Sequence, residues 1–96
     1  MLEKLNDRLI NELITTIVSI DDFDRCADFL EDLCTYTELR SMAQRLEVAK
    51  LLNSGMVYSE IAQKTGSSTA TISRVKRALD YGNGGYMNVI RKLEEQ

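Results

Sequence analysis

The sequence contains no proline and no histidine, and aromatic residues make up only 6% of it. Such a composition favours helices over a β-sandwich or barrel, whose strands draw on aromatic residues. Without imidazoles, the two cysteines are too few thiols for a zinc site, and no cofactor is expected. No apolar run approaches the roughly 18 residues that a membrane-spanning helix needs. These absences predict a small all-α protein that does not enter a membrane.

The two cysteines, Cys26 and Cys34, are eight residues apart in one predicted helix. At about 1.5 Å of rise per residue they lie roughly 12 Å apart, beyond the ~7 Å limit for a disulfide. The N-terminus is amphipathic and does not resemble a secretory signal. Reduced thiols and a cytoplasmic location are therefore expected.

The charges are distributed unevenly, although the net charge is only −3. Residues 1–34 hold three cations and nine carboxylates, whereas residues 35–96 hold nine cations and six carboxylates. Between residues 56 and 81 the balance is +2. The acidic N-terminal third should repel phosphate, and a basic face can exist on an acidic protein.

Apolar residues recur at helical spacing in the N-terminal third. Leu5, Leu9, Leu13 and Ile17 predict a helix over Glu3–Val18. Asp21 or Asp22 can cap a second helix, whose apolar face carries Phe23, Cys26, Phe29, Leu30 and Leu33. The first helix has more apolar surface than so small a chain can cover, so we expect burial against a second copy.

Four further helices follow from local signals. Thr35 and Glu38 have the spacing of a capping box, and the third helix should end near Asn53–Gly55. A short helix over Tyr58–Thr65 is followed by Gly66, and Ser67 or Ser68 caps a fifth helix that runs to Tyr81. The glycine-rich loop over 82–85 then precedes a last helix over Tyr86–Gln96. We expect one domain over 1–96, divided into dimerisation helices (1–34), a central helix (35–55), a helix-turn-helix (56–82) and a C-terminal helix (86–96).

The two short helices around Gly66 fit a helix-turn-helix. Ile72, Val75 and Leu79 should hold the second helix against the core, which turns Ala70, Ser73, Arg74 and Arg77 outward. Small residues at the leading end allow a helix to enter the major groove, about 12 Å wide. Hydroxyls can bond there to bases or phosphates, and arginine forks match guanine or phosphate. This pattern predicts that the partner is double-stranded DNA.

The stretch "GSSTATISR" at Gly66–Arg74 resembles the Trp repressor superfamily, within it the small TrpR-like branch of the YerC/YecD type. The resemblance extends without gaps from about Leu39 to Leu79, and to "YGNGGY" at Tyr81–Tyr86. It implies a homodimer of six-helix subunits with intertwined N-terminal helices and two DNA-reading heads. It places Thr69, Ala70, Thr71, Ser73 and Arg74 near the bases. The remaining predicted DNA-binding residues are Tyr58, Ser59, Ser67, Ser68, Lys76 and Arg77.

The sequence departs from the tryptophan-binding repressor at the positions that hold the indole. The resemblance maps the effector pocket onto Gln44, Arg74, Val75 and Ala78. Only Arg74 keeps the family's residue type, because Val75, Ala78 and Gln44 replace a glycine, a serine and an arginine. Val75 would fill the volume of the indole, so an effector other than tryptophan, or none, is expected.

The predicted function is a sequence-specific DNA-binding transcriptional regulator, a repressor that reads the major groove as a dimer. Catalysis is not expected, because the chain lacks histidine and its glycine-rich loop follows a helix rather than a strand. Two alternatives stay open: a helical dimer that binds another protein, and a DNA-binding accessory factor without repressor activity.

Overall fold

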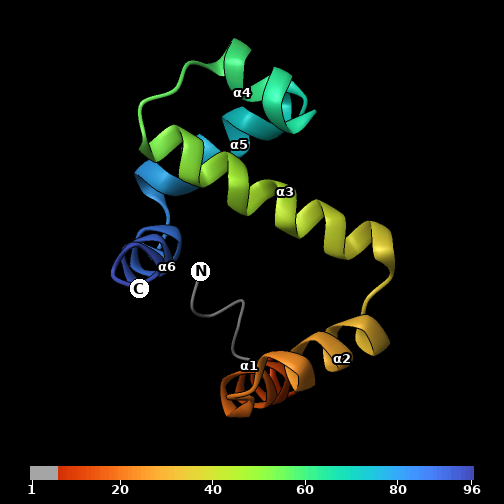
Figure 1. Cartoon of the computed structure of the whole chain (residues 1–96). Coiled ribbons are helices and arrows are strands. Elements are labelled where there is room, and N and C mark those ends of the chain that lie inside the picture. Colours follow the sequence, from red (N-terminus) through yellow and green to blue (C-terminus); the bar gives the residue numbers. More distant parts are fainter. Residues whose placement is uncertain (1–6) are drawn as a thin grey trace. The chain divides into compact units, whose positions relative to one another are not determined.

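The computed structural model describes residues 7–96, which form six helices and no strand (Figure 1). The helices are α1 (Arg8–Ser19), α2 (Phe23–Leu33), α3 (Tyr36–Asn53), α4 (Tyr58–Thr65), α5 (Thr69–Tyr81) and α6 (Gly85–Glu94). The predicted all-α class is confirmed. Contacts divide the chain into a first unit, residues 1–39, and a second unit, residues 40–96, and each unit is described by itself.

Aspartates begin the first two helices. Asp7 has an extended backbone, and its carboxylate accepts hydrogen bonds from the amides of Leu9 and Ile10 at 2.7 and 3.2 Å. Helix α1 therefore begins at Arg8, and residues 3–6 of the predicted helix lie outside the described residues. Asp22 caps α2 by accepting from the amide of Arg25 at 2.9 Å.

The capping box predicted before α3 is present. The amide of Thr35 donates to Glu38 Oε1 at 2.8 Å, and the amide of Glu38 donates to Thr35 Oγ1 at 3.1 Å. Hydrogen bonding of the carboxylate to the backbone amide of Thr35, and then to its side chain, holds the pKa of Glu38 below its usual value. The two residues thus fix the first turn of α3 at the predicted place.

Gly66 makes the turn between α4 and α5. Its backbone is left-handed, with φ 73° and ψ 9°, and its amide donates to the carbonyl of Ala62 at 2.8 Å. Ser68 then caps α5 by accepting from the amide of Thr71 at 3.1 Å. The Gln44 Nε2 of α3 donates to the carbonyl of Thr65 at 2.7 Å and fastens the end of α4 to α3. The turn is therefore held from both sides.

Gly66→Ala should lower the free energy of unfolding by about 1–2 kcal/mol, because a Cβ is strained in the left-handed region. Urea denaturation at fixed protein concentration measures the loss. Gly85→Ala is the matched control, since Gly85 lacks a positive φ and has open space around it. An equal effect of the two substitutions would contradict the role assigned to Gly66.

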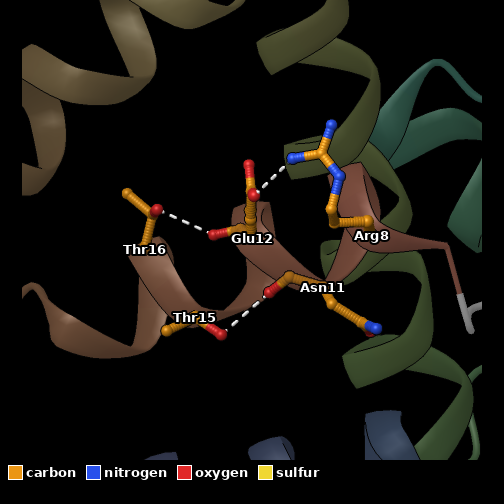
Figure 2. Close-up of a pocket in the computed structure, with 5 residues that line it drawn as sticks. All are labelled: Arg8, Asn11, Glu12, Thr15 and Thr16. Atoms are coloured by element: carbon orange, nitrogen blue, oxygen red, sulfur yellow. Dashed lines mark hydrogen bonds and ion pairs between the residues drawn. The ribbon is translucent and has the colours of Figure 1, made fainter.

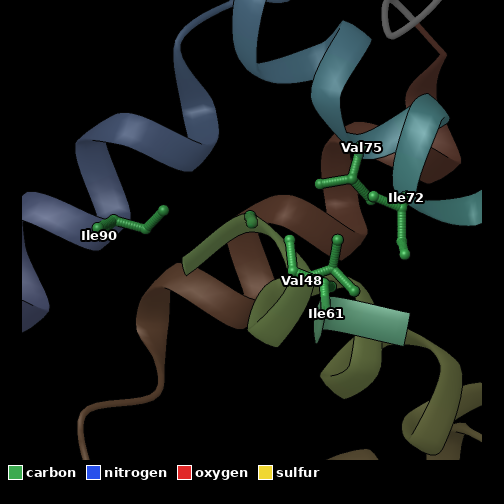
Figure 3. Close-up of a cluster of buried hydrophobic side chains, with 6 residues drawn as sticks. Val48, Ile61, Ile72, Val75 and Ile90 are labelled. Carbon is green, nitrogen blue, oxygen red and sulfur yellow. The ribbon is translucent and has the colours of Figure 1, made fainter. Parts of the chain in front are cut away.

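The buried core lies in the second unit and comes from four helices (Figure 3). Its members are Val48, Ala49, Ile61, Ile72, Val75 and Ile90, each at most 2% exposed. Ile72 and Val75 of α5 lie inward, where Leu79 also packs, as the sequence predicts. Because this side of α5 is fixed against α3, α4 and α6, the opposite side must face outward.

Among residues 7–39, the described part of the first unit, there is no such core. Neither α1 nor α2 has a buried residue. Five of the six apolar residues of α1 are exposed in the single chain, from 39% at Leu13 to 78% at Val18, and Phe23 of α2 is 85% exposed. These two helices therefore present an uncovered apolar face.

The polar side of α1 satisfies its own hydrogen bonds (Figure 2). Arg8 pairs with Glu12 at 2.7 Å, and the hydroxyls of Thr15 and Thr16 donate to the carbonyls of Asn11 and Glu12. This side lines an open depression, and the residues of 7–96 that line it all belong to α1. The apolar face of α1, in contrast, is largely exposed to solvent.

Candidate functional site

The outward side of α5 carries a row of exposed polar and basic residues. Ser73, Arg74 and Arg77 are exposed, whereas Ile72 and Val75 of the same helix are buried. Within residues 7–96, neither guanidinium lies within ion-pair distance of a carboxylate. The site therefore presents two positive charges, which no carboxylate of residues 7–96 pairs with, on one side of a well-anchored helix.

Lys76 differs from these two arginines. Its Nζ lies 3.3 Å from Asp80 Oδ1, one helical turn further along α5. The two side chains are 48% and 42% exposed, so water screens the pair and its strength is modest. Asp80 thus partly neutralises the cation on one flank of the site.

Asp80→Asn should raise the affinity for DNA by about two- to fivefold, because it frees Lys76 and removes a negative charge that repels phosphate. Fluorescence anisotropy with a labelled duplex measures the change. Asp32→Asn in the first unit makes the same change in net charge and serves as the control. If the affinity for DNA rises equally in both variants, the effect comes from total charge and not from the Lys76–Asp80 pair.

At the leading end of α5, some hydroxyls form hydrogen bonds within the helix start and others are exposed. Thr69 and Ala70 are exposed, and Thr71 is half-buried. Ser68 is exposed, but its hydroxyl caps the helix and donates to Thr71 Oγ1 at 3.1 Å. Ser68 and Thr71 are therefore already engaged with each other, which leaves Thr69 and Ala70 as the freest residues of this end.

Ser67 is placed differently from the prediction. It is only 6% exposed, and its Oγ is buried with no hydrogen-bond partner among residues 7–96. Its amide donates to Thr65 Oγ1 at 3.1 Å. The hydroxyl does not reach the surface, so Ser67 shapes the turn and offers no side chain to a ligand in this conformation.

Tyr58 and Ser59 open helix α4. Tyr58 is 37% exposed and Ser59 is exposed. The N-cap residue, Val57, supplies no side-chain hydrogen bond, so the first amides of α4 have no side-chain acceptor. Free amides at a helix start are suited to an anionic oxygen.

The four predicted effector-pocket residues do not all line the cavity beside Gln44. Val75 is 2% exposed within the core, and the amide group of Gln44 is bonded to Thr65. The cavity beside Gln44, about 200 Å³, is also lined by Arg40, Ala43, Glu47, Lys64 and Thr65. Arg74, Val75 and Ala78 do not line it, and Arg74 and Ala78 are exposed on α5.

The described residues show neither a metal-binding cluster nor a membrane-spanning helix. Residues 7–96 hold no group of three or more acidic or cysteine side chains placed to bind a metal ion. None of the six helices is long and apolar enough to cross a membrane.

One exposed residue of α5 was not identified from the sequence. Tyr81, the last residue of the helix, is 84% exposed. Its spacing could have identified it: Tyr81 follows Arg74 by seven residues and Arg77 by four, which places all three on one face of a helix.

Known proteins resemble this chain over nearly its whole length. An uncharacterized Bacillus subtilis protein, YerC, is 46% identical over 98% of this chain and 90% of its own length. The crystal structure of a TrpR-like protein from Eubacterium eligens has a TM-score of 0.91 and 49% identity, and covers 96% of this chain and 95% of that one. The crystal structure of a proposed Trp repressor from Staphylococcus aureus has a TM-score of 0.92 and 41% identity. This match covers 100% of this chain and 96% of that one. The family model described as Trp repressor protein matches residues 8–94. The chain belongs to the Trp repressor family.

Proposed function

We propose that this protein is a sequence-specific DNA-binding transcriptional regulator, a repressor, which reads the major groove with α5 as a homodimer. One observation carries the proposal: the side of α5 opposite Ile72 and Val75 is exposed and presents Arg74 and Arg77 without opposing carboxylates among residues 7–96. Because chromosomal DNA is the proposed partner, the protein would act in the cytoplasm.

The residues along α5 suit different parts of a duplex. Thr69 and Ala70 are small and exposed, so the leading end can approach the base edges, where a methyl group can contact the methyl of thymine. Ser73 and Arg74 follow one turn later, and a guanidinium can bind guanine O6 and N7 together. We assign base readout to this part of α5 and phosphate contacts to Lys76 and Arg77.

Helix α4 would contact the DNA backbone. Its first amides have no side-chain cap, and Tyr58 and Ser59 stand beside them with exposed hydroxyl-bearing side chains. A phosphate oxygen would satisfy these amides and would gain from the positive end of the helix dipole. Such contacts set the position of a protein on the duplex without reading its sequence.

A second copy of the chain would cover the apolar face of α1 and α2. The described part of the first unit buries no residue in either helix, and a pair of short helices cannot form a core alone. In a two-fold dimer, the two α5 helices would enter successive major grooves about 34–36 Å apart. The binding site on DNA should then be palindromic.

An effector, if one controls the dimer, would not be tryptophan. Val75 occupies the core where the family's indole site needs a glycine, and Gln44 is engaged with Thr65. The one remaining cation of that site, Arg74, belongs to the proposed reading face.

The proposal is tested by selecting bound duplexes from a random pool, with and without a panel of amino acids. We expect enrichment of a palindromic sequence with half-sites 10–10.5 base pairs apart, and no change on adding tryptophan. Binding without any enrichment would favour a DNA-binding accessory factor. No binding at all would favour a module that binds another protein.

A further inference from the structure

Tyr81 lies on the same side of α5 as the two outward arginines. At about 100° per residue, a position seven residues after Arg74 is turned by only about 20° from it. The side chain is 84% exposed, although a tyrosine ring has a large apolar surface. An exposed aromatic residue in line with two cations is suited to contact the ligand that the arginines bind.

The backbone after Tyr81 keeps this position open. A Cβ at position 82 would lie 2.4 Å from the carbonyl oxygen of Ala78, closer than any side chain allows, so the chain leaves the helix at Gly82 because it is a glycine. The amide of Gly82 donates to that same carbonyl at 2.9 Å. Gly84, with φ 80°, makes the following turn into α6. Tyr81 therefore stands at the end of the helix, and the chain turns away directly behind it.

The length of α5 places Tyr81 beyond the bases. Ala70 and Tyr81 are eleven residues apart, which is about 16 Å along the helix axis. The major groove is only about 12 Å wide. When the leading end lies among the base edges, the far end reaches the border of the groove, where the phosphates are.

We propose that Tyr81 binds the DNA backbone: its phenolic hydroxyl donates a hydrogen bond to a phosphate oxygen at the edge of the groove that α5 enters. This inference rests on the proposed function and extends the interface by one helical turn. A phenol is a donor without charge, and only two side-chain torsions are fixed when it binds. Tyr81 should therefore position the helix without adding to the salt dependence of binding.

Tyr81→Phe tests the hydroxyl alone, because it keeps the ring. We expect affinity to fall about five- to tenfold, equally on a selected duplex and on an unrelated one. The slope of log affinity against log salt should stay unchanged, whereas Arg77→Ala should reduce it by about 0.9, the value for one lost phosphate contact. Tyr36→Phe is the control, since Tyr36 is 78% exposed in the first unit and has no assigned contact.

A duplex with single neutral methylphosphonates locates the contact. At the contacted phosphate, the methylphosphonate and Tyr81→Phe combined should lower the affinity no more than either change does alone, because both remove the same hydrogen bond. At other phosphates the two effects should add.

The outcomes separate this inference from the proposed function. Unchanged affinity of Tyr81→Phe for DNA would overturn the inference about Tyr81. A loss of affinity confined to one sequence would also overturn it, because that would indicate base readout. Loss of the dimer by sedimentation would also overturn it, because Tyr81 would then belong to the subunit interface. If the wild-type protein binds no duplex, both proposals fail; if Arg74→Ala weakens binding and Tyr81→Phe does not, only this one fails.

Discussion

Arg74→Ala is expected to weaken binding to a selected duplex by about 1–3 kcal/mol and to relax the preference at one base pair. Arg74 is exposed on the side of α5 opposite the core, one turn from Ala70, where its guanidinium can reach a guanine edge. Titration of the selected duplex and of single-base variants measures both effects.

Arg77→Ala serves as the matched comparison for Arg74. It removes the same charge from the same side of the helix, but nearer its C-terminal end. We expect a similar loss on every duplex and a smaller salt slope. If both variants bind as the wild type does, α5 does not contact DNA through this side.

Charges placed on the apolar face of α1 are expected to dissociate the dimer. Leu13 and Ile17 are 39% and 42% exposed in the single chain, and one turn separates them on α1. Replacing both by glutamate would bury four unpaired carboxylates in a two-fold interface, at several kcal/mol in total. Analytical ultracentrifugation should show a monomer, and affinity for a palindromic duplex should fall at least about 100-fold, because the two heads are no longer linked.

Thr16→Glu is the control for this prediction. Thr16 lies on the polar side of α1, where its hydroxyl bonds to the carbonyl of Glu12 (Figure 2). This variant should stay dimeric and keep its affinity for the palindrome. A double glutamate variant that also stays dimeric would show that another surface joins the two chains.

The helix boundaries could be predicted where a local signal fixes them. The capping box of Thr35 and Glu38 and the end of α4 at Gly66 depend on neighbouring residues alone, and both were found as predicted. The bounds of α4 also agreed. The apolar repeat predicted a helix over Glu3–Val18 that included Asp7, and this was wrong at Asp7, which is extended and caps α1.

The parts that the sequence did not reveal depend on how side chains are placed in space. Two adjacent serines could each cap α5, and only packing decides that Ser68 does so while Ser67 is buried. The bond from Gln44 to Thr65 joins residues 21 positions apart, so no local pattern predicts it. The pair between Lys76 and Asp80 has a common helical spacing, but its distance comes from side-chain conformation.

Methylation interference at guanine N7 tests the reading of the major groove by α5 most directly, because this atom lies in that groove. On a selected duplex, the wild-type protein should show two clusters of interfering guanines, centred about 10–10.5 base pairs apart and related by two-fold symmetry. Arg74→Ala should abolish interference at one guanine in each cluster. Binding that no guanine methylation impairs would contradict the account.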